Sequence, residues 1–222
     1  MAAQPGRDRG RRPLVHRGAV LRCTWRFERE AQGQGCGSVA GVDEVGRGAL
    51  CGPVVAGAVI LGAGFNARGL DDSKRLTRRQ RERAAEHIKA KALAWAVASA
   101  DPAEIDRHNI LRATYIAMRR ALDALPVAPD LVLVDALTIP EVTTAQRAIV
   151  KGDALSVSIA AASIVAKVAR DAMMADWDQR YPGYGLASNM GYGSSDHREA
   201  LRRMGPSEIH RRSFHGTQRW LF

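Results

Sequence analysis

The apolar positions of the chain form several short runs of the kind that make buried strands. Residues 39–42 and 54–61 are almost wholly apolar, and a glycine-rich segment joins them, so this part predicts a strand, a turn and a second strand. Asp130–Asp135 holds only apolar residues between two aspartates and is the clearest strand pattern in the chain. Because such a run is apolar on both faces, it indicates a central strand of an α/β sheet. Residues 148–150 predict a further short strand, and residues 95–100 are compatible with one.

Other segments repeat their apolar residues at helical spacing. They are residues 77–91, 103–125 (as one helix or two), 156–181 and 196–204. The first begins with a capping-box pattern, Thr77–Gln80, which satisfies free amides of the first helical turn. The third begins with small residues, which allow a helix to pack closely on a sheet. The glycine-rich segment 183–195 is predicted to be a loop.

Composition and charge then narrow the class of protein. Of the 222 residues, 46% are hydrophobic and 25% are charged, as in an ordinary globular protein, and no window approaches the roughly 18 apolar residues of a membrane span. The net charge of +10 favours a polyanionic partner, above all nucleic acid. The three cysteines lack the spacing of a disulfide framework or a zinc site, so we expect a cytoplasmic location. No long heptad indicates an oligomer, and we expect a monomer.

The first 36 residues differ from the rest of the chain. They are rich in arginine and have no apolar core of signal-peptide type, so we predict a basic, disordered N-terminal tail over residues 1–36. One interpretation is a basic arm that raises nonspecific affinity for nucleic acid. The alternatives are a transit peptide and a wrongly assigned start codon.

Carboxylates stand where the strand patterns end. Asp43 and Glu44 interrupt the first strand, Asp135 ends the buried one, and Asp153 follows the last. Burying a charge in or beside an apolar strand costs free energy. If the four carboxylates converge, their mutual repulsion would protonate some of them unless cations keep them ionised. A hard divalent cation is the natural partner, and a pair of Mg²⁺ ions is a standard device for phosphodiester hydrolysis. Taken singly, an aspartate at a strand end is more often a turn former or a helix cap.

A series of short motifs follows in order along the chain. The blocks are 41–48 with 52–54, Asp72–Ser73–Lys74, Val134–Asp135, 151–153, 161–171, 191–193 with His197, and 210–214. Together they resemble the type 2 ribonucleases H and, within these, the bacterial ribonuclease HII family. The resemblance spans residues 39–214.

This resemblance implies an α/β, RNase H-like fold with a mixed central sheet flanked by helices. It implies a catalytic domain over residues 37–181 and a helical, substrate-binding C-terminal extension over residues 182–222. The implied reaction is hydrolysis of RNA in RNA/DNA hybrids and cutting 5′ of ribonucleotides embedded in duplex DNA, which leaves 3′-hydroxyl and 5′-phosphate ends. The implied ligands of two Mg²⁺ or Mn²⁺ ions are Asp43, Glu44, Asp135 and Asp153.

The resemblance also implies how substrate is bound. Gly46, Arg47 and Gly48 would read the ribose 2′-hydroxyl, Tyr192 would stack on the following deoxyribose, and Lys74 would meet a phosphate. Glycines let backbone amides approach a sugar closely, and the 2′-hydroxyl is the group that distinguishes RNA from DNA. Without the resemblance, Tyr192 would be interpreted as a hydrogen-bonded loop tyrosine.

Some positions need separate interpretation. Ala136–Leu137 follows Asp135 where many relatives have Gly-Asn, so the metal ligand is kept but the loop beside it is expected to differ in detail. Met190 stands where lysine is usual, so one phosphate contact is expected to be missing. His197 and His210 are interpreted as structural, because sequence identifies no nucleophile that they could serve.

Two alternatives stand beside this assignment. Ribonuclease HIII typically carries an extra N-terminal domain and lacks the arginine of the Gly-Arg-Gly turn, so Arg47 argues against it. A noncatalytic nucleic-acid-binding module on the same fold would be expected to have lost acidic positions, whereas all four are present here.

The last five residues suggest a protein partner. Gln218, Leu221 and Phe222 match the Gln-x-x-Leu-Phe type of peptide that docks on bacterial sliding clamps, and an exposed apolar anchor suits such a groove. The alternative is that Trp220 and Phe222 pack back on the domain.

Overall fold

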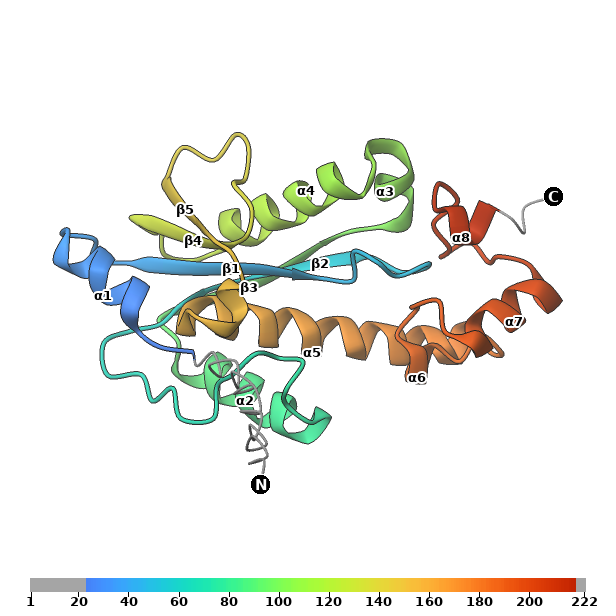
Figure 1. Cartoon of the computed structure of the whole chain (residues 1–222), viewed down its shortest axis with the longest axis horizontal. Helices are drawn as coiled ribbons and strands as arrows, with labels where there is room; N and C mark the ends of the chain where they lie inside the picture. Colours follow the sequence, from blue (N-terminus) through green and yellow to red (C-terminus); the bar gives the residue numbers. More distant parts are fainter. Residues whose placement is uncertain (1–22, 219–222) are drawn as a thin grey trace, which may run out of the picture.

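The apolar runs form the strands of one five-stranded sheet, which lies between two layers of helices (Figure 1). The computed structural model describes residues 23–218. The strands are β1 (Val39–Val45), β2 (Val54–Ile60), β3 (Ala94–Ala100), β4 (Leu131–Asp135) and β5 (Ala145–Ile149). Their order across the sheet is β3-β2-β1-β4-β5. The pairs β1–β2 and β2–β3 are antiparallel and the pairs β1–β4 and β4–β5 are parallel, which confirms the predicted mixed sheet.

The helices predicted over residues 77–91, 103–125, 156–181 and 196–204 begin and end close to the predicted positions. The helices of the described residues are α1 (Arg26–Gly33), α2 (Arg78–Lys91), α3 (Pro102–His108), α4 (Ile110–Asp123), α5 (Val157–Arg180), α6 (Leu186–Asn189), α7 (Ser195–Met204) and α8 (His215–Gln218), of which α1, α6 and α8 were not predicted. The predicted capping box starts α2, where the Gln80 amide donates to the Thr77 hydroxyl and the Thr77 amide donates to the Gln80 side chain. Asn109 separates α3 from α4 with a φ of 67°, so the segment 103–125 forms two helices.

Glycines on the strands bring α5 close to the sheet. A Cβ atom on Gly41 of β1 would lie 2.1 Å from the backbone of Ser158, and one on Gly57 of β2 would lie 2.5 Å from the Ala162 carbonyl oxygen. The small residues at the start of α5 therefore pack against bare backbone, as the sequence predicts. On the opposite face, α4 covers β1, β2 and β3 with the apolar core between them.

The N-terminal segment departs from the prediction. Residues 23–36, assigned above to a disordered tail, hold α1, so the tail prediction is wrong for that stretch. Glu28 is buried and its Oε1 accepts hydrogen bonds from the Ser156 hydroxyl (2.6 Å) and the Ser158 amide (2.9 Å) at the start of α5. Ala31 and Phe27 of α1 also pack on a small apolar cluster, so α1 is held by this polar contact together with a few apolar ones. Residues 1–22 lie outside the described chain.

Smaller differences occur at one sheet edge and in one loop. The strand β5 begins at Ala145, three residues before the predicted start, because its outward residues are exposed and break the apolar run. The predicted loop 183–195 contains the short helix α6. Between Cys23 and Gln218, no helix is both long and apolar enough to cross a membrane.

Candidate active site

Three of the predicted carboxylates line one cavity. Asp43, Glu44 and Asp135 share a cavity of about 280 Å³ with every predicted substrate-binding residue. These are Gly46, Arg47, Gly48, Lys74 and Tyr192. Residues far apart in the sequence therefore meet at one place, as the motif pattern predicts.

The strand register explains why the carboxylates meet. β1 and β4 run parallel, and Val42 lies beside Val134. The next residue on each strand is an aspartate, so Asp43 and Asp135 come from adjacent positions at the carboxyl ends of two paired strands. Glu44 follows on β1 and adds a third carboxylate at the same edge.

Asp43 accepts hydrogen bonds from two donors. Its Oδ1 accepts the amide of Glu44 at 2.7 Å, and the hydroxyl of Ser163 on α5 also donates to it. Ser163 in turn lies 3.0 Å from the hydroxyl of Ser73. Burial raises the pKa of Asp43 well above its usual range, and the neighbouring Glu44 charge raises that pKa further. An ionised Asp43 thus needs a cation nearby.

Glu44 has one satisfied oxygen and one free oxygen. Its Oε1 accepts from Nη1 of Arg47 at 3.2 Å. Its Oε2 is buried and has no hydrogen-bond partner among residues 23–218. Burial raises the pKa of Glu44, while Arg47 opposes that shift. A buried acceptor without a donor is the kind of atom that a metal ion satisfies.

Asp135 and Asp153 occupy different settings. Asp135 Oδ1 accepts the amide of Gly152 at 2.7 Å, and burial raises the pKa of Asp135. Asp153, in a short 3₁₀ turn (Gly152–Ala154), is buried but does not line the cavity. Its Oδ2 accepts from Nζ of Lys74 at 2.9 Å, which raises the pKa of Lys74. The structure therefore pairs the predicted phosphate ligand with the fourth predicted carboxylate.

The donor set suits a hard divalent cation. Three carboxylates in one cavity repel each other, and burial beside like charges raises the pKa of all three. One of their oxygens, Oε2 of Glu44, has no hydrogen-bond partner among the described residues. Mg²⁺ and Mn²⁺ prefer such oxygen ligands. The residues thus fit the predicted cations.

The two positions that depart from the family pattern have an unusual backbone conformation. Ala136 has a φ of 53°, in the left-handed region that favours glycine. The other departure, Met190, also has a positive φ of 51°, at the end of α6. Both residues thus adopt a left-handed backbone although neither is a glycine.

The two histidines predicted to be structural, His197 and His210, form a chain of hydrogen bonds that ends at the backbone of Tyr192. The Ser207 amide donates to Nδ1 of His210 at 3.0 Å, which places the His210 proton on Nε2. That Nε2 lies 3.1 Å from Nε2 of His197, whose Nδ1 then donates to the Tyr192 carbonyl at 3.0 Å. Cys51 lies close enough for the three to form a metal-ligand set, but every ring nitrogen already has a partner. The chain of hydrogen bonds supports the structural interpretation.

Sequence reasoning missed the residues that support the site. Ser163, Arg170 and Arg211 lie within the quoted motifs, yet no role was assigned to them. A serine among alanines at the start of α5 was the available signal for Ser163. Nothing in the sequence marks Arg170 and Arg211 as buried, because arginine is usually exposed.

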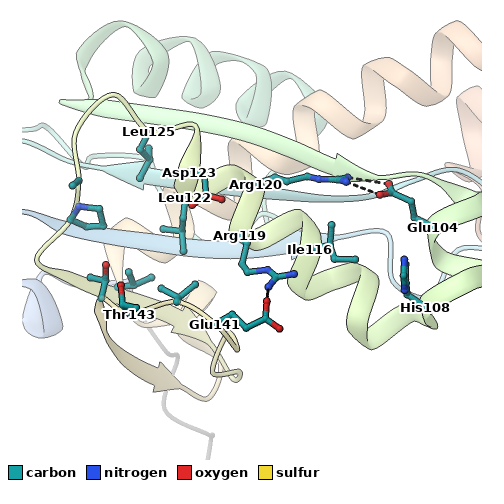
Figure 2. A pocket seen from close by; sticks show the side chains of 15 residues that line it. Glu104, His108, Ile116, Arg119, Arg120, Leu122, Asp123, Leu125, Glu141 and Thr143 are labelled. Carbon is teal, nitrogen blue, oxygen red and sulfur yellow. Dashed lines mark hydrogen bonds and ion pairs between the residues drawn. The ribbon is translucent and has the colours of Figure 1, made fainter.

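A larger cavity, of about 750 Å³, lies away from the carboxylates (Figure 2). Four of its charged residues form two ion pairs, Arg120 with Glu104 at 2.7 Å and Arg119 with Glu141. None of the predicted site residues lines it. Its size alone therefore does not make it a candidate for the chemistry.

Comparisons with known proteins agree with the motif pattern. Residues 40–217 match the sequence model described as Ribonuclease HII. The chain is 55% identical over 183 residues to the ribonuclease HII of Desulfitobacterium hafniense strain Y51, covering 82% of this chain and 70% of that one. It is 54% identical over 198 residues to the ribonuclease HII of Myxococcus xanthus strain DK1622, covering 89% and 68%.

Solved structures share the fold. The ribonuclease H2 of Pyrococcus horikoshii OT3 is 29% identical with a TM-score of 0.70, covering 82% of this chain and 96% of that one. The ribonuclease HII of Archaeoglobus fulgidus in its complex with PCNA is 27% identical with a TM-score of 0.64, covering 78% and 91%. Bst-RNase HIII in complex with Mn²⁺, at 22% identity and a TM-score of 0.66 over 83% and 69%, shows the fold alone. The predicted RNase H-like fold is confirmed.

Proposed function

The chain belongs to the ribonuclease HII family, and on that basis we propose that it cuts duplex DNA on the 5′ side of an embedded ribonucleotide as well as the RNA strand of RNA/DNA hybrids. Family membership makes it a metal-dependent ribonuclease H, an endonuclease that acts on RNA paired with DNA. The observation that carries the finer proposal is the single cavity in which three carboxylates meet the Gly46–Gly48 turn and Tyr192.

The carboxylates are proposed to hold two divalent cations. Asp43, Glu44 and Asp135 supply the nearest oxygens, and the free Oε2 of Glu44 is available without breaking a hydrogen bond. When bound, such cations activate a water and stabilise the leaving 3′ oxygen, which gives 3′-hydroxyl and 5′-phosphate ends. Both Mg²⁺ and Mn²⁺ suit these ligands, and the Mn²⁺ complex of Bst-RNase HIII makes Mn²⁺ a natural choice beside Mg²⁺.

Asp153 and Lys74 are proposed to act as a linked pair. Lys74 holds Asp153 at 2.9 Å while its side chain is 78% exposed. A substrate phosphate at the cavity can draw Lys74 away, because an exposed lysine exchanges anionic partners at little cost. Asp153 is then free to join the other three carboxylates.

The turn and the tyrosine are proposed to recognise the RNA–DNA junction. A Cβ atom on Gly48 would lie 3.9 Å from Cε1 of Tyr192, so the turn faces the edge of the ring. Backbone amides of residues 46–48 can reach a ribose 2′-hydroxyl, which only RNA carries. The ring packs on the next sugar and disfavours an added hydroxyl there. Residues 37–181 thus supply the chemistry and residues 182–222 complete the substrate site.

The C-terminal peptide is proposed to bind a sliding clamp. Gln218, Leu221 and Phe222 match the docking pattern, and the A. fulgidus relative forms a complex with PCNA. Residues 219–222 lie outside the described chain. We also propose that the enzyme acts as a monomer in the cytoplasm.

The test is cleavage of an end-labelled DNA duplex that contains one ribonucleotide, with Mg²⁺ or Mn²⁺. We expect a cut immediately 5′ of the ribonucleotide and none in an all-DNA duplex. Asp43→Asn should lower the rate by at least about 100-fold, and Arg47→Ala by about 10-fold. A wild-type protein that binds the duplex but never cuts with either metal would overturn the proposal in favour of a binding module.

A further inference from the structure

Two arginines lie fully buried beneath the candidate active site. Arg170 on α5 and Arg211 after α7 are each 0% exposed. In the described part of the chain, neither forms a salt bridge, and their hydrogen bonds go to backbone carbonyls. Burial lowers the pKa of both guanidinium groups, that of Arg211 to about 9. A buried cation without a carboxylate is costly, so a purely space-filling role is an insufficient explanation.

Arg211 holds the turn that faces the substrate. Its Nη2 donates to the Gly46 carbonyl at 2.7 Å, and its Nη1 donates to the Arg47 carbonyl at 2.8 Å. Its Nε donates to the Gly52 carbonyl at 2.9 Å and so joins the two ends of the β1–β2 connection. The carbonyl and the amide of a trans peptide point in opposite directions. Two carbonyls fixed on the buried side therefore turn the amides of Arg47 and Gly48 away from Arg211.

Those two amides are available for a ligand. Arg47 and Gly48 line the cavity. Among residues 23–218, neither amide has a hydrogen-bond acceptor. Arg211 thus decides which side of the turn presents donors to the cavity.

Arg170 joins the same connection to the segment that carries the tyrosine. Its Nε donates to the Pro53 carbonyl at 3.0 Å, and its Nη2 donates to the Cys51 carbonyl at 3.3 Å. Its Nη1 donates to the Met190 carbonyl at 2.8 Å. One planar side chain therefore spans two segments that are about 140 residues apart in the sequence.

The same guanidinium also lies between the turn and the ring. Its Cζ is 5.6 Å from the centre of the Tyr192 ring. Gly46, with a φ of 93°, packs so closely that a Cβ atom there would lie 2.2 Å from Nε of Arg170. The turn, the arginine and the ring are thus one packed unit.

We propose that Arg170 and Arg211 are positioning residues that set the separation between the Gly46–Gly48 turn and Tyr192, and thereby the preference for an RNA–DNA junction over continuous RNA. This inference rests on the proposed function, because the turn and the ring are its two recognition elements. A guanidinium holds several carbonyls at fixed angles with one rigid fork, whereas the ammonium of lysine is a single rotatable group. Charge alone therefore does not substitute for the geometry.

The experiment compares two substrates on the same preparations of Arg170→Lys and Arg211→Lys. One substrate is a DNA duplex with a single ribonucleotide, and the other is a continuous RNA/DNA hybrid, both cut in Mn²⁺. The ratio of the two kcat/KM values is independent of the fraction of folded enzyme, since one sample cuts both. Arg180→Lys at the exposed end of α5 and Arg212→Lys, exposed and adjacent to Arg211, are the matched controls.

We expect each buried-site variant to lower the junction-to-hybrid ratio by at least about 10-fold, as a displacement of about 1 Å at a recognition element does. The controls should keep the wild-type ratio, and the rise in melting temperature on adding Mn²⁺ should persist in all variants. An unchanged ratio with uniformly lower rates would overturn the inference, and so would failure of both variants to fold. Either result would mean that the arginines only stabilise the fold. A wild-type enzyme that cuts the hybrid but not the single ribonucleotide would instead remove the proposed junction activity, and the inference with it.

Discussion

At the scale of single residues, the buried charge of Asp43 is expected to lower the stability of the metal-free protein. Its carboxylate is buried beside Glu44 with a raised pKa, so its charge destabilises the metal-free fold. Asp43→Asn keeps the oxygen that accepts the Glu44 amide and removes the charge. We expect the variant to be about 1–3 kcal/mol more stable than the wild type in EDTA, measured by thermal unfolding. Added Mn²⁺ should raise the melting temperature of the wild type and have much less effect on the variant.

The control for this prediction is Asp176→Asn, because Asp176 is exposed on α5. It should follow the wild type both in EDTA and in Mn²⁺. A lower stability of Asp43→Asn in EDTA would show that the ionised carboxylate stabilises the fold and would contradict the prediction.

The carboxylates of the candidate site could be picked out from the sequence because charge inside an apolar run is conspicuous. Asp43 and Asp135 each end such a run, and the parallel register of β1 and β4 brings the two residues side by side. Arg170 and Arg211 could not be predicted as buried. Their burial depends on carbonyls supplied by separate segments, and no local pattern records that arrangement.

At the scale of elements, a buried carboxylate helps to dock α1 on the start of α5, beside the apolar contacts of Ala31 and Phe27. Glu28 accepts two hydrogen bonds there, from the Ser156 hydroxyl and the Ser158 amide. Glu28→Ala leaves both buried donors unpaired, and we expect a loss of about 2–4 kcal/mol in the free energy of unfolding, measured by urea denaturation. The exposed Glu86 on α2 gives the control, since Glu86→Ala should change stability by less than about 0.5 kcal/mol. Equal stability of the two variants would mean that α1 contributes little to the fold.

The C-terminal extension should make stability depend on pH. Burial lowers the pKa of His197 and lowers that of His210 to about 4, whereas an unfolded histidine titrates near 6.5. Between those pH values the two histidines bind protons in the unfolded chain but not in the folded one. Their effect on stability is therefore absent above about pH 6.5, and they destabilise the fold as the pH drops toward 4. For His210 alone the loss is of the order of 3 kcal/mol. Urea denaturation at pH 7.5 and pH 4.5 measures it.

The matched variant for the pH prediction is His210→Gln. It should have a smaller loss of stability between the two pH values than the wild type, although it starts less stable. The buried carboxylates with raised pKa values have the opposite effect on stability over the same range, and His210→Gln leaves them unchanged. Equal losses in the wild type and in the variant would therefore contradict the prediction.

Elements with strong local signals were predicted well, and those held by tertiary contacts were not. The capping box of α2 and the small residues of α5 are local, and both appear as expected. By contrast, α1 has few apolar residues and depends on Glu28, so its pattern resembles that of a tail. The strand β5 lies at a sheet edge, where exposed residues hide the alternation.

At the scale of the whole molecule, the net charge and the fold could be predicted from the sequence because each depends on many residues together. The net charge of +10 agrees with a family that acts on nucleic acid, and ordered motifs over most of the chain specify the fold. The relation between the catalytic domain and its C-terminal segment was out of reach. It depends on the antiparallel bridge between Cys51 and His210, two residues far apart in the chain.

The charge and the C-terminal peptide together predict two separable modes of binding. Deleting residues 218–222 should abolish binding to a purified bacterial sliding clamp, because Gln218, Leu221 and Phe222 supply the anchors of the docking pattern. Cleavage of a short duplex without the clamp should stay within about twofold of the wild type, since the catalytic cavity is built from residues 43–192 and the positive charge is spread over the chain. Arg219→Ala changes a position that the docking pattern leaves open, and it should bind the clamp like the wild type. Surface plasmon resonance on immobilised clamp, run beside the cleavage assay, separates the two modes. If the intact protein shows no binding to the clamp, the docking proposal is wrong and the peptide belongs to the domain.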